Sequence, residues 1–170
     1  MAIHFTSDTH FGDIGAINIR RRPFASLAEH DAALIARWNA VVAPGDEVWH
    51  LGDFGKGKVE RLAAILGALN GCKHLVTGNI DTPALTALPD WASVQPYAEL
   101  SLDGHRLVLC HYPFRSWNGE GKGALNLHGH SHGRLKPLRR QVDVGVDVWN
   151  YAPVALPALL QAAAGKRAPA

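Results

Sequence analysis

The stretch LHGHSHG, residues 127–133, places three histidines at alternate positions among small residues. It follows an apolar run and is typical of a β-strand that ends in a loop. Side chains of an extended chain alternate, so His128, His130 and His132 point to one side. Histidine seldom fills a core without a partner, and three on one side indicate that this loop holds something.

The whole chain has 170 residues, of which 47% are hydrophobic and 19% charged, and its formal net charge is +2. These values fit one globular domain with a sizeable core, and they lack the charge density of a dedicated nucleic-acid binder. Cys72 and Cys110 form no CxxC pair, so we expect two reduced, buried thiols. The start MAIHFTSD has no signal-peptide pattern and no apolar run is of membrane-spanning length, so we expect a cytoplasmic protein.

Strands and helices alternate in the first half of the chain. Ser26 and Glu29 form a capping box that opens an amphipathic helix over 26–42, and a second helix runs from Val59 to a stop at Asn70-Gly71. Strands are expected at 2–10, 47–53 and 73–79.

The second half is rich in strands. A hairpin is expected over 97–113 around Asp103-Gly104, and further strands at 124–130 and 141–148. This order predicts an α/β protein with two sheets rather than one doubly wound sheet.

Polar residues follow strand after strand. In α/β proteins, ligands bind beyond the carboxyl ends of the strands. Carboxylates, an amide and imidazoles together suit Mn, Fe, Zn or Ni better than Ca or Mg. A closed structural zinc site would have four ligands, usually with cysteine. Here the candidates are too many for one ion and suit two: Asp8, His10, Asp53, Asn79, His111, His130 and His132.

In this order the motifs D-x-H, GD, GN, H and GH-x-H resemble those of the calcineurin-like metallophosphoesterase superfamily, over residues 6 to about 150. The motifs DTHFGD, LGDF, HYPFRSWN and LHGHSHG look like those of a small bacterial subgroup. The resemblance implies an α/β fold, a four-layer αββα sandwich of two mixed β-sheets flanked by helices. We expect a single metallophosphoesterase domain over 1–163 and a flexible C-terminal tail over 164–170.

The resemblance also implies two divalent metal ions, with Mn favoured and Fe, Ni and Zn as alternatives. A metal-bridging hydroxide would attack phosphorus in line. Asp53 would bridge the two ions, and His128 would be a strand residue or a partner of a ligand. One ion would take Asp8, His10 and His132, and the other Asn79, His111 and His130.

The motif GNID (78–81) departs from the superfamily, in which phosphomonoesterases mostly have a histidine at the position of Ile80. That histidine is thought to protonate the leaving group, and general acids contribute about 10²–10⁴-fold. Ile80 therefore favours a phosphodiesterase. The alternatives are a phosphomonoesterase or nucleotidase with another proton donor, a non-catalytic metal-binding scaffold, and a nuclease, for which the chain lacks an extended basic surface.

Arg115 follows the candidate ligand His111 by four residues and suits a phosphate oxygen. We assign it a catalytic and substrate-binding role, beside Asp53 and Asn79 as catalytic residues. Trp117 and Asn118 are candidates for a substrate-binding wall, although Trp117 also fits a core position.

Several other polar residues receive weaker assignments. At least two of the three arginines at 20–22 are expected to be solvated, and Asp13 to bind a loop N–H. Asp143 and Asp147 are expected near the site without being ligands, and the glycine-rich loop 119–123 is a candidate lid. His50 is the one further histidine that can belong to the site; His4, His74 and His105 are expected to be structural.

The expected partner is a small phosphate-ester substrate, a nucleotide among the candidates. We expect no stable nucleic-acid complex and no membrane association. The sequence leaves the physiological substrate and the oligomeric state open.

Overall fold

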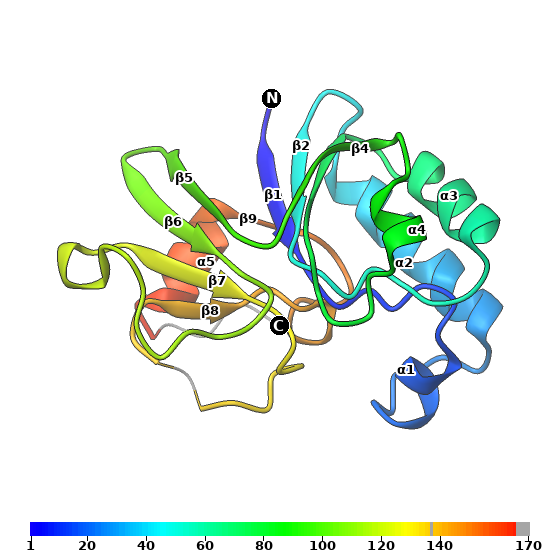
Figure 1. Cartoon of the computed structure of the whole chain (residues 1–170). Helices are drawn as coiled ribbons and strands as arrows, with labels where there is room; N and C mark the ends of the chain where they lie inside the picture. Colours follow the sequence, from blue (N-terminus) through cyan, green and yellow to red (C-terminus); the bar gives the residue numbers. More distant parts are fainter. Residues whose placement is uncertain (137, 166–170) are drawn as a thin grey trace.

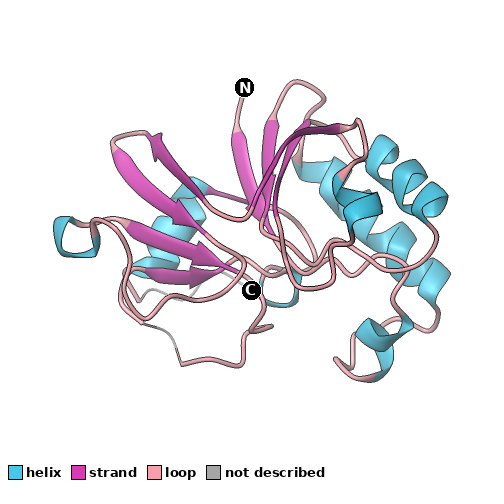
Figure 2. Ribbon diagram, in the orientation of Figure 1, coloured by secondary structure: helices cyan, strands magenta, loops and turns pink. Residues whose placement is uncertain are grey.

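The structure, a computed structural model, describes residues 1–136 and 138–165. Two β-sheets pack face to face, with helices around them (Figures 1 and 2). The first sheet has the order β4-β3-β2-β1-β9 and comprises β1 (Ile3–Thr6), β2 (Glu47–His50), β3 (Cys72–Val76), β4 (Trp91–Gln95) and β9 (Val154–Ala155). The second has the order β5-β6-β7-β8 and comprises β5 (Ala98–Leu102), β6 (His105–Leu109), β7 (Leu125–His128) and β8 (Gln141–Asp143).

Both sheets are mixed. β1 to β4 run parallel to one another, and β9 pairs antiparallel with β1. In the second sheet, β5 and β6 form an antiparallel hairpin, whereas β6, β7 and β8 are parallel. The parallel strands of each sheet therefore end at one edge, where the loops that follow them gather.

Helices complete the layers. α2 (Leu27–Val41), α3 (Val59–Ala68) and α4 (Pro83–Thr86) cover the outer face of the first sheet, and α5 (Leu156–Ala163) packs against β1, β8 and β9. The α/β fold with two mixed sheets flanked by helices is thereby confirmed. The remaining short helices are α1 (Ile14–Asn18), η1 (Glu120–Lys122) and η2 (Val146–Val148).

The core between the sheets follows from the alternation of side chains along the strands. In β6, Leu107 and Leu109 lie in the inter-sheet core with Leu127 of β7. Val108, between them, points to the opposite face and packs against Trp117 and Ala124. The chain after β6 therefore covers the outer face of the second sheet.

Local signals in the sequence explain several boundaries. Ser26 Oγ accepts the Glu29 N–H at 3.1 Å, and Glu29 accepts the Ala25 N–H at 2.8 Å, which confirms the capping box. The hairpin turns at Asp103 and Gly104, both with positive φ.

Two expectations were wrong. The strand expected over 141–148 ends at Asp143, because the Asp143 carboxylate binds the Gly145 N–H and turns the chain into η2. Cys72 is exposed at the start of β3, whereas Cys110 is buried as expected.

No helix in the described part of the chain is both long enough and apolar enough to cross a bilayer. The domain boundary at residue 163 stays a prediction. Of the predicted tail, residues 166–170 lie outside the described residues.

We expect Leu127→Ala to lower the free energy of unfolding by about 2–5 kcal/mol, because Leu127 is fully buried between the sheets. Leu135→Ala is the matched control, since this leucine is 53% exposed and its truncation should change stability by less than about 0.5 kcal/mol. Urea denaturation of the two variants measures the difference. Equal midpoints would contradict the placement of Leu127.

Candidate metal centre

The loops that follow the parallel strands of both sheets meet at one edge of the molecule. Ser7, after β1, forms a bridge with Gly145, after β8. The His130 N–H donates to Asp8 Oδ2 at 2.9 Å, and this bond also joins the two sheets. Side chains that are far apart in the sequence thus become neighbours.

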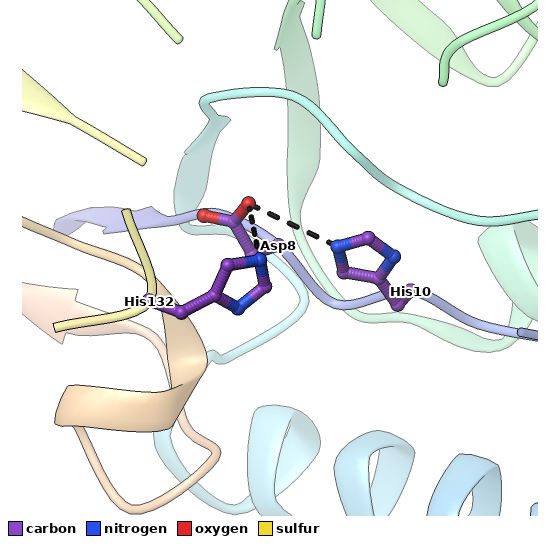
Figure 3. Close-up of side chains that lie close together, drawn as sticks. All are labelled: Asp8, His10 and His132. Atoms are coloured by element: carbon purple, nitrogen blue, oxygen red, sulfur yellow. Dashed lines mark ion pairs between the residues drawn. The ribbon is translucent and has the colours of Figure 1, made fainter. Parts of the chain in front are cut away.

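One group of possible metal ligands consists of Asp8, His10 and His132. One ligand atom of each lies within 4.8 Å of the others. Asp8 Oδ1 is 3.6 Å from His132 Nε2 and 4.0 Å from His10 Nε2, and Figure 3 shows both rings directed at the carboxylate. All three side chains are almost fully buried.

A second group of possible ligands consists of Asp53, His111 and His130. Asn79 lies with this group, because its Oδ1 is 3.2 Å from His111 Nε2 and 3.0 Å from His130 Nδ1. His111 is buried, whereas His130 and Asn79 are exposed. The second group is therefore the one more open to solvent.

Asp53 lies between the two groups. Its Oδ2 is 3.6 Å from His10 Nε2, and its Oδ1 is 3.5 Å from His111 Nε2. Each carboxylate oxygen thus faces one group. All seven side chains expected at the centre are brought together in this arrangement.

The histidines of the first group fit a cation. Their Nδ1 atoms are bound, that of His10 to Asp13 at 3.1 Å and that of His132 to Asp147 at 2.7 Å. Their Nε2 atoms are buried and have no hydrogen-bond partner in the described structure. A buried polar atom without a partner is costly, and a divalent metal ion bound here would supply the missing partner.

The electrostatics of the first group also fit a cation. Burial raises the pKa of Asp8 to about 7, against the lowering effect of His132. Burial is also the largest cause that lowers the pKa of His10, to about 4. A bound cation would restore the charge of the carboxylate, and a neutral imidazole is the form that binds metals.

Five of the candidate ligands have left-handed backbone conformations. Such conformations are uncommon outside glycine and cost of order 1–3 kcal/mol each. They turn the loops sharply, so that the side chains converge. The φ angles are 57° at Asp8, 52° at His10, 56° at Asp53, 65° at His130 and 48° at His132.

Arg22 holds the first group in place, although we expected most of its run to be solvated. The side chain is buried and donates to the carbonyls of Asp8 and Thr9 at 2.6 and 2.8 Å. It also binds both carboxylate oxygens of Asp147 and donates to His30 Nε2 at 2.9 Å. Arg22 thus fixes the loop that carries Asp8 and also the carboxylate that orients His132.

The aspartates behind the ligands have separate tasks. Burial alone would raise the pKa of Asp147, but its hydrogen bonds with His132 and Arg22 hold it well below its usual range. Asp81, which we did not expect at the site, accepts the N–H groups of Asp53 and Gly78 at 3.0 and 2.7 Å. Asp81 thus joins the loops after β2 and β3. Its position in the GNID motif was the sequence signal that could have placed it near the site.

Asp13 and Asp143 also support loops. Asp13 accepts the Gly15 N–H at 2.9 Å, as expected of a loop residue, and additionally binds His10. Asp143 accepts from Ser131 Oγ and the Gly133 N–H, and so supports the loop of His130 and His132. Neither belongs to the two groups of possible ligands.

Gly78 and Gly129 allow the loops to approach one another closely. A Cβ at Gly129 would collide with the side chains of Ser7 and Asp8, and one at Gly78 with Asp53. The glycines in the GN and GH motifs are therefore required by packing around the carboxylates.

Two of the expected substrate-binding residues are engaged elsewhere, and the third is not part of the cavity wall beside the ligands. Trp117 is buried against the outer face of the second sheet, where it packs with Val108 and Ala124. Its Nε1 donates to the Ala124 carbonyl at 3.0 Å, so the ring has a structural role. Asn118 binds the Glu99 carboxylate at 3.0 Å. Arg115 is exposed and does not line the cavity beside the ligands.

The remaining candidates are structural in their contacts. His128 ends β7, and its Nδ1 bonds the Gly129 carbonyl at 2.8 Å. His50 is fully buried, 2.9 Å from Thr9 Oγ1, and burial lowers its pKa to about 3; it belongs to neither group. The loop 119–123 contains η1 and lines neither cavity described below.

A cavity of about 240 Å³ opens beside the candidate ligands. A larger one, of about 620 Å³, lies against Trp149 and Val142, and none of the candidate ligands lines it. The smaller cavity is therefore the candidate substrate site. Its wall includes His10, Asp53, Asn79, Ile19, Ile80, Arg20 and Lys56.

Comparisons with known proteins find a matching family model and similar sequences. Residues 1–149 match the model of the calcineurin-like phosphoesterase superfamily domain. An uncharacterized protein of Methanocaldococcus jannaschii is 31% identical over 163 residues, covering 91% of this chain and 86% of that protein. The gene 66 protein of Mycobacterium phage L5 is 30% identical over 179 residues, covering 85% and 86% of the two chains.

A similar fold occurs in a protein of unknown function from Aquifex aeolicus. Its crystal structure matches with a TM-score of 0.72 and 23% identity, covering 91% of this chain and 95% of that chain. This likeness concerns the fold alone.

We expect Arg22→Met to lower the free energy of unfolding by about 3–5 kcal/mol, because it leaves Asp147 half-buried without its cation. It should also weaken Mn²⁺ binding, since His132 loses an oriented partner. Thermal unfolding and calorimetric titration with Mn²⁺ measure the two effects. Arg21→Met, which removes an exposed neighbour, is the control; if it matches Arg22→Met in both measurements, the assignment is wrong.

Proposed function

We propose that this chain, which belongs to the calcineurin-like phosphoesterase superfamily, is a metal-dependent phosphoric ester hydrolase. In this proposal it binds two divalent ions and prefers phosphodiesters. The observation that carries the proposal is the Asp53 carboxylate, with one oxygen facing each group of candidate ligands. This is the position that a shared ligand of two ions needs. Manganese is the proposed metal, and a cytoplasmic location stays a prediction.

The bound ions would lower the pKa of a water molecule that attacks phosphorus and would neutralise charge on the phosphate oxygens. The protein's own part is to hold the ligands. Asp8, His10 and His132 would hold one ion, and His111, His130 and Asn79 the other. The Leu51 carbonyl lies 2.8 Å from His111 Nδ1 and so directs Nε2 of that ring to the centre.

The preference for diesters rests on Ile80. Ile80 lines the cavity together with Asp53 and Asn79, and its N–H donates to Asp53 Oδ1 at 3.1 Å. An alkyl side chain cannot protonate a leaving group, and the loss of a general acid is most severe for poor leaving groups. The backbone N–H of Ile80 therefore supports Asp53, the candidate bridging residue, but the Ile80 side chain has no proton to donate to a leaving group.

A phosphomonoesterase is the second candidate function, and one residue favours it. Lys56 lines the same cavity, and an ammonium group can donate a proton. Its Nζ is 3.2 Å from Asp13 Oδ2, which lies at the same cavity. Lys56 is thus the residue that would take the place of the absent histidine.

The paired test uses metal-stripped protein reloaded with Mn²⁺. Bis-p-nitrophenyl phosphate and p-nitrophenyl phosphate release the same leaving group, so their kcat/KM ratio isolates diester from monoester selection. We expect the ratio to favour the diester. Ile80→His, which restores an imidazole at this position, should raise monoester turnover by about 10-fold or more.

Asp53→Asn is the inactive control. It removes the negative charge of the carboxylate between the two groups and should abolish turnover of both substrates. An excess for the monoester in the unmodified protein, lost in Lys56→Met, would overturn the diester preference in favour of the second candidate. A protein that binds Mn²⁺ and hydrolyses neither ester would support the scaffold alternative.

A further inference from the structure

The three consecutive arginines at 20–22 differ in their surroundings. Arg22 is buried, with its guanidinium fully engaged by the loop of Asp8 and by Asp147. Arg21 is exposed. Arg20 is half-buried and lines the cavity of about 240 Å³ together with the candidate ligands His10, Asp53 and Asn79.

In the part of the chain that the structure describes, Arg20 has no ion-pair partner. Over residues 1–136 and 138–165 its guanidinium makes neither a hydrogen bond nor an ion pair. The nearby carboxylate of Asp13 is engaged by Lys56, His10 and the Gly15 N–H. A free guanidinium beside a metal centre is therefore available to an anion.

The cavity that Arg20 lines reaches the second group of candidate ligands. Asn79 lines the same cavity, and its Oδ1 is 3.0 Å from His130 Nδ1.

The backbone around Arg20 is anchored on both sides. Before it, Asp13 caps α1 and binds the ring of His10. After it, Arg22 binds the carbonyls of Asp8 and Thr9. Although α1 contacts little besides α2 (Figure 1), the segment between the two anchors is held against the loop that carries the first group.

We propose that Arg20 is the substrate-binding residue of this centre and that its guanidinium binds a non-bridging oxygen of the substrate's phosphate group. The inference rests on the proposed function, and it gives Arg20 the role that the sequence suggested for Arg115. A planar guanidinium offers two parallel donors to phosphate oxygens, whereas an ammonium offers a point charge. Ile19 and Ile80 supply the apolar part of the same cavity wall, so the phosphate would be held on the side of Arg20.

The test measures binding of inorganic phosphate to Mn²⁺-loaded protein by calorimetry, with metal content determined on the same samples. We expect Arg20→Met to weaken phosphate binding by about 10- to 100-fold, because it removes a charged hydrogen bond. Arg20→Lys should recover only part of the loss. Arg21→Met, the matched control, should bind phosphate as the unmodified protein does, and metal content should be equal in all samples.

Three results would overturn the proposal: equal phosphate affinity in Arg20→Met and Arg21→Met, a loss of affinity in Arg115→Met but not in Arg20→Met, or a loss of metal in Arg20→Met. Failure of the proposed function has a different signature. In that case phosphate binding would still depend on Arg20, while the unmodified protein would hydrolyse neither p-nitrophenyl ester.

Discussion

The placement of the Asp53 carboxylate between two groups of imidazoles is the constraint on which the rest of the molecule depends. Loops from both sheets have to converge on it, so the parallel strands of the two sheets must end at the same edge. Asp81 fixes the backbone of Asp53 from one side, and Gly78 permits the approach of the neighbouring loop. The two sheets thereby position the loops that surround this carboxylate.

This arrangement is unfavourable without a cation. The ligand loops contain left-handed residues, and two buried Nε2 atoms lack partners within the described structure. Hydrogen bonds around the centre offset part of this free-energy cost. Arg22 makes several of them, since it binds backbone carbonyls, Asp147 and His30. Strain and unsatisfied groups of this kind are expected where a sequence is selected for binding rather than for stability.

The sequence predicted the centre better than its surroundings. Polar residues at strand ends are a local pattern, and sheet topology brings such ends together, so Asp8 and His132 could be named as candidate ligands from the sequence. Their assignment to the same ion came from the resemblance to the superfamily. The tasks of Arg22 and Trp117 could not be predicted, because their partners are set by tertiary packing. Asp147 lies 125 positions from Arg22 in the chain. Likewise, Arg115 follows His111 by only four positions, and this spacing suggested that Arg115 lies close to the substrate. The structure shows that Arg20, and not Arg115, lines the cavity.

The central claim is that two ions bind, one in each group, with Asp53 between them. Its most direct test is the metal content of protein loaded with Mn²⁺ and freed of excess metal, compared with His132→Ala and His111→Ala. We predict two ions per chain in the unmodified protein and one in each variant, because each substitution removes a ligand from one group only. A single ion in the unmodified protein, lost in both variants, would show one shared site and contradict the account.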